Sequence, residues 1–164
     1  MSDRADRYER GFVGGWLTIE HYRRTGCRDV PNLPGVYLVH RGELDPPQWL
    51  VDSPVEVYKG KAAAYPIATL RARWDDRAQF LYYGQAGGGS SNATLRQRIR
   101  QYLAWSAGKT GHAGGRAIWQ IAGAGQFRIA WAVQQLLDPL DVERELLDDH
   151  VAKYGRLPFA NFRR

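Results

Sequence analysis

Residues 80–105 read FLYYGQAGGGSSNATLRQRIRQYLAW and carry three kinds of local signal in succession. Residues 80–83 are aromatic and apolar, which is typical of a β-strand. Residues 84–92 are rich in glycine and serine, which predicts a flexible loop. Residues 93–105 place apolar side chains at the helical period. The stretch therefore predicts a strand, a loop and a helix in direct succession, an arrangement typical of a layered α/β domain.

The helix predicted at residues 93–105 has one apolar stripe, made of Leu95, Ile99, Tyr102 and Leu103. Arg98 falls on the edge of this stripe, one turn before Tyr102, whereas Arg96 and Arg100 point away from it. The stem of Arg98 is therefore expected against the core, with its guanidinium group at the rim of a sheet. A surface arginine whose stem lies along apolar neighbours is the alternative.

Two further strands are predicted at residues 36–39 and 127–133. The last helix is predicted to begin at Asp138, a good N-cap, followed by Pro139 at the first helical position. These elements complete the order strand, strand, helix, strand, helix.

Three other stretches are less regular. Residues 5–23 suggest a short helix and a loop broken at Gly14 and Gly15. The proline-rich residues 40–79 predict a small hairpin, formed by residues 49–51 and 55–58, and a short helix over residues 68–74. Residues 106–117 are glycine-rich and are predicted to be mostly loop.

The composition restricts the class of protein. The chain has 164 residues, 44% of them hydrophobic, which suits one domain with a substantial core. No apolar run is long enough to span a membrane, and the first residues lack the apolar stretch of a secretion signal. Cys27 is the only cysteine, so the chain has no internal disulfide and no cysteine-based metal cluster, and a cytoplasmic location is expected. The net charge of +6 favours an anionic partner, with nucleic acid first.

The last predicted helix carries a carboxylate where an apolar side chain is expected. Glu143 lies near the middle of its apolar half, and Glu145 lies on the polar side. A carboxylate on an apolar face is costly unless it is paired or bound to a metal. Glu143 is therefore either one partner of a buried salt bridge, with Arg98 as the candidate cation, or a metal ligand or catalytic carboxylate. His150, further along the same half, is expected to be a core histidine.

Several of these residues fall in a familiar order. Gly35-Val36-Tyr37 and Tyr82-Tyr83-Gly84 resemble the two signatures of the GIY-YIG nuclease superfamily, and the resemblance extends over residues 34–161. Four more positions are similar to those that the family uses: Arg98, Tyr102, Glu143 and Asn161. The interval between the signatures, residues 38–81, is longer than the family usually has. Tyr58-Lys59-Gly60 is a second candidate for the later signature, but only Tyr82 is followed by a glycine-rich loop and an arginine helix.

The resemblance implies a single α/β domain over residues 1–164, with a central three-stranded, mainly antiparallel sheet flanked by helices. Residues 1–33 would form an N-terminal extension and residues 40–79 an insertion between the first two core strands. It also implies a phosphodiesterase that leaves 5′-phosphate and 3′-hydroxyl ends. Its cofactor would be Mg²⁺ or Mn²⁺, held by Glu143.

The implied roles can be assigned to single residues. Tyr37 would be the general base, and we expect Arg98 and the metal to favour its phenolate. Arg98 would neutralise the phosphate. Tyr82 and Tyr102 would orient water and phosphate. Two further catalytic candidates complete the set, His112 as a second assisting histidine and Asn161 near the end of the chain.

Basic residues outside this set predict the contacts with nucleic acid: Arg116, Arg96, Lys59, Lys61 and Arg73. DNA is the expected partner, and RNA is left open. A single centre cuts one strand at a time, so a double-strand break would need a homodimer or two encounters. Two rival interpretations remain. One is a nucleic-acid-binding module with the same fold that cleaves nothing. The other is an unrelated α/β interaction domain, in which Glu143 would be paired in a dry core and distant from Tyr37.

Overall fold

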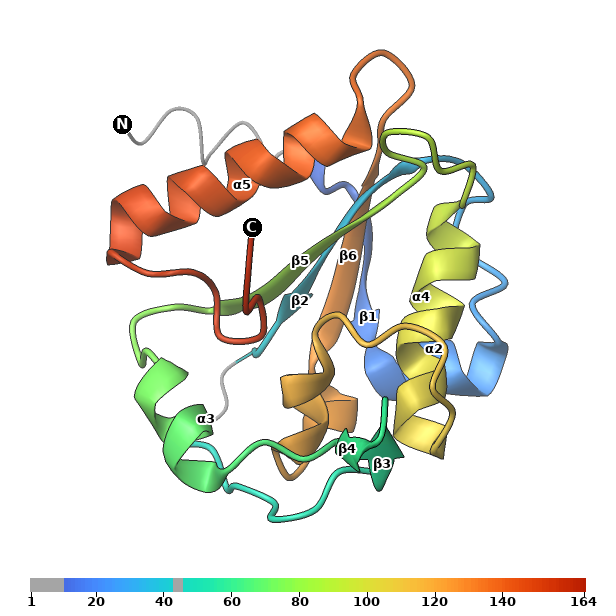
Figure 1. Cartoon of the computed structure of the whole chain (residues 1–164). Coiled ribbons are helices and arrows are strands. Elements are labelled where there is room, and N and C mark those ends of the chain that lie inside the picture. The colour runs from blue at the N-terminus through green and yellow to red at the C-terminus, as the bar shows by residue number, and fades with distance from the viewer. Residues whose placement is uncertain (1–10, 43–45) are drawn as a thin grey trace.

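The computed structural model describes residues 11–42 and 46–164 and shows a mixed α/β architecture. A four-stranded antiparallel sheet in the order β1-β6-β2-β5 forms its centre, and a two-stranded sheet of β3 and β4 is separate from it. Helix α5 lies on one side of the central sheet, and α2 and α4 lie on the other (Figure 1). The elements are β1 (Gly14–Thr18), α2 (Ile19–Thr25), β2 (Gly35–His40), β3 (Val57–Tyr58), β4 (Lys61–Ala62), α3 (Ile67–Arg73), β5 (Phe80–Ala86), α4 (Leu95–Ala104), η1 (Trp105–Ala107), η2 (Arg116–Gln120), η3 (Ala124–Gln126), β6 (Arg128–Val133) and α5 (Pro139–Tyr154).

Strand β2 contributes to two hydrophobic cores, one on each face of the central sheet. Val36 and Leu38 pack with the apolar side chains of α5. Tyr37 and Val39 belong to the larger core, which contains buried residues of α2, α4 and η2. Because successive side chains of a strand point to opposite faces, a strand buried on both sides reads as a continuous apolar run. This is why residues 36–39 were recognisable as a strand.

The expected three-stranded sheet has a fourth strand, β1, from the N-terminal region. The sequence predicted a loop at Gly14 and Gly15, and this prediction is wrong. Both glycines pair with β6, and a Cβ atom on Gly14 would lie 2.1 Å from Nε1 of Trp131. Gly15 has a φ of 87°, next to a register shift of the strand. The two glycines therefore make room for the indole ring of Trp131. Residues 5–10 of the predicted helix lie outside the described residues.

The prediction of a hairpin within residues 40–79 is also wrong about which residues pair. Trp49 forms an isolated bridge with Ile121, and the hairpin is instead made by β3 and β4. The turn between these strands is Lys59-Gly60, and both residues have positive φ angles. This is the backbone conformation that favours a two-residue hairpin. The helix predicted at residues 68–74 is confirmed, with small changes, as α3.

The two long helices begin as their sequences predict. Thr94 caps α4 and forms a capping box with Gln97. Asp138 caps α5 by accepting a hydrogen bond from the Leu140 N–H, and Pro139 occupies the first turn. The predicted strands at residues 80–83 and 127–133 are confirmed as β5 and β6. No helix among the described residues is long and apolar enough to cross a membrane.

Candidate active site

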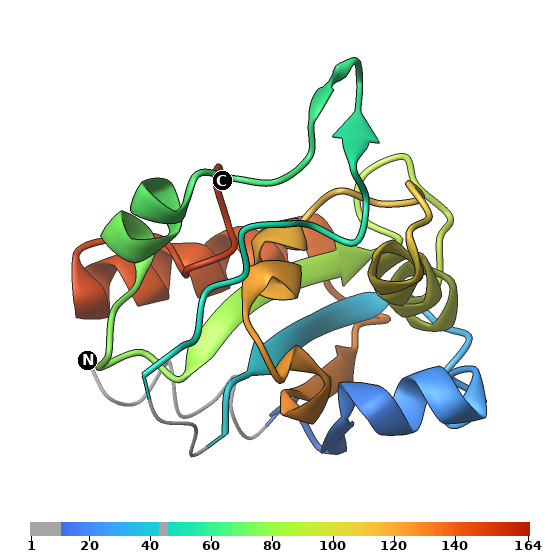
Figure 2. The ribbon, with the colours of Figure 1, turned by 90° about the horizontal axis from the view of Figure 1, so that it is seen from below.

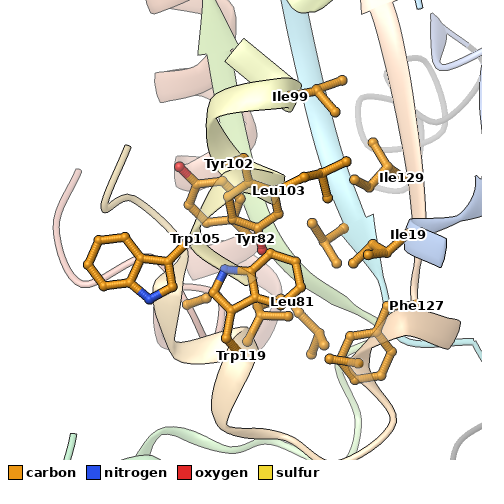
Figure 3. Packing of buried hydrophobic residues seen from close by; sticks show 14 of the residues in the cluster. Ile19, Leu81, Tyr82, Ile99, Tyr102, Leu103, Trp105, Trp119, Phe127 and Ile129 are labelled. Atoms are coloured by element: carbon orange, nitrogen blue, oxygen red, sulfur yellow. The ribbon is translucent and has the colours of Figure 1, made fainter. Parts of the chain in front are cut away.

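Three buried tyrosines meet where β2, β5 and α4 come together. The rings of Tyr82 and Tyr102 are stacked, with centroids 5.6 Å apart and 5° between the planes. The ring centroid of Tyr37 lies 5.9 Å from that of Tyr82 and 6.2 Å from that of Tyr102. Figure 3 shows Tyr82 and Tyr102 beside the indole rings of Trp105 and Trp119. The three tyrosines that the family resemblance assigned to one site are thus neighbours.

The glycine of the second signature creates space for the tyrosine of the first. In the β2–β5 pair, Tyr37 stands opposite Gly84. A Cβ atom on Gly84 would lie 2.5 Å from Cζ of Tyr37, so the phenol ring lies across the bare backbone of this residue. Side chains on directly opposed residues of an antiparallel pair share one face of the sheet. The sequence Tyr82-Tyr83-Gly84 therefore positions Tyr37 as well as Tyr82.

Burial dominates the acidity of these phenols. It raises the pKa of Tyr37 well above its usual value, and the neighbouring Tyr82 and Tyr102 raise it further. Arg98 lowers the pKa of Tyr37, in the direction expected from the sequence, but this is the smallest of the effects. Burial likewise raises the pKa of Tyr82 and of Tyr102. All three side chains are neutral phenols at pH 7. The Tyr37 hydroxyl is buried and interacts with the Tyr82 hydroxyl, without a hydrogen bond of regular geometry.

Arg98 and His112 form a polar pair beside the tyrosines. Nη1 of Arg98 lies 3.2 Å from Nδ1 of His112 and 3.4 Å from Oε1 of Gln101. Burial, followed by the charge of Arg98, lowers the pKa of His112 to about 4, so the ring is neutral at pH 7. A guanidinium group only donates hydrogen bonds, so Nδ1 must be the acceptor. The proton of the neutral ring is therefore on Nε2, and this atom is a hydrogen-bond donor.

Two glycines leave space in front of this pair. A Cβ atom on Gly114 would lie 2.7 Å from Nε2 of His112 and 2.7 Å from the hydroxyl of Tyr82. Gly115 has a φ of 73°, and a Cβ atom there would lie 2.8 Å from the ring of Tyr102. The two polar atoms therefore both approach the bare backbone of Gly114, where a side chain would not fit. The sequence predicted only a loop over this glycine-rich segment; the available signal was the pair Gly114-Gly115, two residues after His112.

Glu143 reaches the same site from the other face of the sheet. Its helix, α5, packs on the face opposite α4, and its charge is close enough to raise the pKa of Tyr82. The charge of Arg144, followed by that of Arg98, in turn lowers the pKa of Glu143. Groups from helices on opposite faces can meet beside an edge strand, and β5 is one of the two edge strands of the sheet. The site therefore lies at the edge of β5.

The carboxylate of Glu143 has no counter-ion in contact. It forms no salt bridge with Arg98 or with any other cation among the described residues. Burial raises its pKa to about 7. The alternative of a buried salt bridge to Arg98 is thus wrong, and Glu143 is not paired as an unrelated interaction domain would require. A half-buried carboxylate without a partner is stabilised by a cation.

The donor set suits a hydrated divalent ion. The described residues contain no cluster of three or more His, Cys, Asp or Glu side chains, so Glu143 would be the main protein ligand. Mg²⁺ usually retains several waters and binds one or two carboxylates, in keeping with a single glutamate at an open site. The unpaired carboxylate of Glu143 therefore fits such an ion.

Comparisons with protein-family models, curated proteins and solved structures find no match for this chain. What the site can do must therefore be inferred from its own side chains. Those side chains are three buried phenols, a guanidinium group, a neutral imidazole and an unpaired carboxylate. Together they can donate hydrogen bonds to an anion and hold a cation.

Asn161 lies along the free edge of β5 and contacts its backbone. Its side-chain oxygen accepts a hydrogen bond from the Tyr83 N–H, and its amide nitrogen donates to the Tyr83 carbonyl. The Ala160 N–H donates to the Leu81 carbonyl at 2.8 Å. The segment thus covers the edge of β5 and fixes the backbone on both sides of Tyr82. Both polar atoms of the Asn161 side chain are engaged with the backbone of Tyr83 at this edge.

The five predicted nucleic-acid contacts divide into two groups. Arg96 donates to the carbonyls of Val30 and Arg28, and Arg73 donates to carbonyls of residues 158, 159 and 161. These two guanidinium groups hold chain segments together. In contrast, the side chains of Arg116, Lys59 and Lys61 form no hydrogen bond or ion pair with the described residues. Binding of nucleic acid by any of the five stays a prediction.

Proposed function

We propose that this chain is a metal-dependent DNA endonuclease that hydrolyses phosphodiester bonds. The observation that carries the proposal is the convergence of six groups from distant parts of the sequence at the edge of β5: Tyr37, Tyr82, Arg98, Tyr102, His112 and Glu143. A module that only binds DNA gains nothing from an unpaired carboxylate in this position, because a carboxylate repels phosphate.

Arg98 and His112 supply the donors that a phosphate needs. The guanidinium group of Arg98 is always charged and can donate to the non-bridging oxygens of a phosphodiester. Nε2–H of His112 lies against the bare backbone of Gly114 and would donate a second hydrogen bond. Donors that are fixed before the reaction stabilise developing negative charge without reorganising. This pair would bind the scissile phosphate, with the Tyr82 hydroxyl as a third donor.

Glu143 would hold the divalent ion, Mg²⁺ or Mn²⁺. When bound, such an ion supplies Lewis-acid chemistry, which neutralises phosphate charge and makes bound water more acidic. The chain's own contribution is to keep this carboxylate half-buried and without a competing cation. Its affinity for the ion is expected to fall below pH 7, where the raised pKa of Glu143 leaves the carboxyl protonated.

Tyr37 would accept the proton of the attacking water. It has this role by resemblance to the GIY-YIG family, and its hydroxyl forms no hydrogen bond of regular geometry in the site. The high pKa of the phenol means that the phenolate is scarce at neutral pH. The rate is therefore expected to rise with pH if this assignment is correct.

A nucleic-acid-binding module that does not cleave is the second candidate. The burial of Tyr37 favours it, because a phenol whose pKa lies well above 10 is a poor proton acceptor at neutral pH. The two candidates agree on Arg98 as a phosphate-binding residue. They differ in what Glu143 does.

The deciding experiment incubates the full chain with supercoiled plasmid and with branched DNA, in Mg²⁺ or Mn²⁺, beside an EDTA control. Glu143→Gln is compared with Asp148→Asn, which alters an exposed carboxylate of the same helix. Cleavage that requires the metal and Glu143 but not Asp148 supports the nuclease. Nicking alone indicates that the monomer acts, and linearisation indicates a homodimer or two encounters. Salt-sensitive binding without cleavage supports the binding module instead.

A further inference from the structure

Arg116 lies in an aromatic setting next to the candidate site. Its guanidinium carbon is 4.6 Å from the ring centroid of Tyr65, 5.4 Å from that of Tyr58 and 5.7 Å from that of Trp105. These rings come from three separate segments of the chain. Each contact is a cation–π interaction, which attracts a guanidinium group to the face of an aromatic ring. The three rings together hold the Arg116 side chain in one position.

The hydrogen-bonding capacity of Arg116 is unused. Nε is buried and has no partner, and the terminal amino groups form no hydrogen bond with the described residues. A guanidinium group has five N–H donors, and a desolvated donor without an acceptor is costly. No carboxylate among the described residues forms a salt bridge with Arg116. An oxyanion from outside the chain would supply the missing acceptors.

A second cation shares one of these rings. Nζ of Lys59 lies 5.3 Å from the ring centroid of Tyr58. Lys59 is in the turn of the β3–β4 hairpin, which extends away from the central sheet, and Lys61 follows in β4 (Figure 2). Both lysines are exposed. Two cations beside one ring repel each other, and a bound anion relieves this repulsion.

The chain links this basic surface directly to the tyrosine site. Arg116 follows Gly115, whose missing side chain accommodates the rings of Tyr82 and Tyr102. Tyr102 also donates a hydrogen bond to the Gly115 carbonyl at 3.4 Å. Arg116, whose guanidinium group is held by the three rings, therefore directly follows a residue that contacts the proposed catalytic tyrosines. A polymeric anion bound at the site would extend over it.

We propose that Arg116, with Lys59 and Lys61 of the hairpin turn, forms a second phosphate subsite that binds the nucleic-acid backbone beside the scissile phosphate. The inference rests on the proposed function for the position of the scissile phosphate at Arg98. The aromatic rings orient the guanidinium group before substrate arrives, so that little conformational entropy is lost on binding. The insertion of residues 40–79 thus contributes both to the rings and to the charges of this subsite.

The test is binding at equilibrium, without catalysis. A fluorescent DNA duplex is titrated with full-length Glu143→Gln protein in EDTA, over about 0.05 to 0.2 M salt. In this background Arg116→Gln should reduce the slope of log affinity against log salt by about 0.9, the value for one lost phosphate contact on a duplex. Its affinity should fall about tenfold, as expected for one charge-assisted hydrogen bond. The control, Arg24→Gln, removes an exposed charge of α2, on the other side of the molecule from the hairpin (Figure 2), and should change neither quantity.

A second variant covers the case in which Arg116→Gln does not fold. Lys59→Gln with Lys61→Gln changes only exposed side chains of the hairpin and should also reduce the salt slope. An unchanged slope in both variants overturns the subsite. If the wild-type protein still cleaves DNA in that case, the proposed function stands and only the subsite is wrong. If the parent protein binds no DNA and the wild type cleaves none, both proposals fail.

Discussion

The buried hydroxyl of Tyr37 is the most informative functional group in the site. It forms no hydrogen bond of regular geometry, although its side chain is fully buried. Removing a buried polar group that lacks a partner is neutral or stabilising, since no bond is lost. A purely structural tyrosine at this position would be replaceable by phenylalanine without loss. A Tyr37→Phe variant therefore separates a structural role of this side chain from chemistry at its hydroxyl.

We expect Tyr37→Phe to unfold at the same denaturant concentration as the wild type or a higher one, but to lose at least about a hundredfold in cleavage rate. Because the pKa of Tyr37 is raised well above 10, the wild-type rate should rise about tenfold per pH unit between pH 7 and 9. Single-turnover cleavage and urea titration measure the two effects. A cleavage rate that does not change between pH 7 and 9, with the chemical step shown to be rate-limiting, excludes Tyr37 as the general base.

The carboxyl group of Glu143 gives a second prediction at this scale. Its pKa is about 7 in the folded protein and ordinary in the unfolded chain, so the folded state binds the extra proton between about pH 4.5 and 7. The group therefore destabilises the fold above pH 7, and this cost disappears as the pH falls. Glu143→Gln, which mimics the protonated form, should stabilise the metal-free protein by about 2 kcal/mol more at pH 8 than at pH 5. Urea titrations in EDTA at the two pH values check this, and an equal effect at both would contradict it.

The space beside Gly114 predicts an effect on activity that is separate from folding. A methyl group there would lie 2.7 Å from the Tyr82 hydroxyl and from Nε2 of His112. Gly114→Ala should therefore lower the cleavage rate about a hundredfold by displacing these donors. Gly111→Ala is the matched control, since its methyl group would meet only ordinary contacts at 3.6 Å or more. Equal activity of the two variants would show that the space has no function.

At the scale of elements, the start of α5 determines how the glycine-rich loop is held. Asp138 accepts from the Leu140 N–H as the helix N-cap and also from the Gly89 N–H, at 3.1 and 3.2 Å. One carboxylate thus joins the loop after β5 to the helix that carries Glu143. Its negative charge is also favourable at a helix N-terminus. The loop and the helix are expected to respond together to a change at this residue.

Asp138→Ala should reduce the free energy of unfolding by about 1–2 kcal/mol, because it removes both the cap and the loop contact. Asp138→Asn keeps an acceptor oxygen and should lose less than half of this. Chemical denaturation measures the difference, and hydrogen exchange at the Gly89 amide reports the loop contact separately. If Asp138→Ala leaves Gly89 exchange unchanged, the carboxylate does not hold the loop.

At the scale of the whole molecule, Gln120 attaches residues 40–79 to the rest of the domain. The side chain is buried, its oxygen accepts from the Tyr65 N–H, and its nitrogen donates to the carbonyls of Leu50 and Tyr65. Leu50 N–H also donates to the Gln120 carbonyl. The inserted segment is thus held to η2 by hydrogen bonds that a single side chain organises.

Gln120→Leu should destabilise the protein by roughly 3 kcal/mol, because it leaves several buried backbone groups without partners. It should also increase proteolytic cleavage within residues 48–66 under native conditions. Gln126→Leu, at an exposed position of η3, is the control and should stay within about 0.5 kcal/mol of the wild type. If residues 48–66 resist proteolysis equally in both variants, other contacts suffice to hold the insertion.

Local signals predicted most of the elements. The caps at Thr94 and Asp138 and the apolar periodicity placed α4 and α5, since these features depend on neighbours within a few residues. The strand β1 was missed because Gly14 and Gly15 read as chain breakers. Their place in the sheet depends on Trp131, which is far away in the sequence. The pairing of β3 with β4 was missed for a different reason, because residues 49–51 pair with the segment around Ile121 instead.

The sequence by itself determined the α/β class, the extent of α4 to within two residues, the start of α5 and the presence of a carboxylate on the apolar side of α5. Each of these depends on periodicity or on capping, which are properties of short segments. Only the tertiary structure decided that Glu143 lacks a salt bridge, that burial keeps Tyr37 protonated, and that Asn161 faces the β5 backbone. Ion pairing and desolvation depend on distances between residues that lie up to a hundred positions apart. The proposed function of the site therefore depends on the three-dimensional arrangement, although its residues were predicted from the sequence.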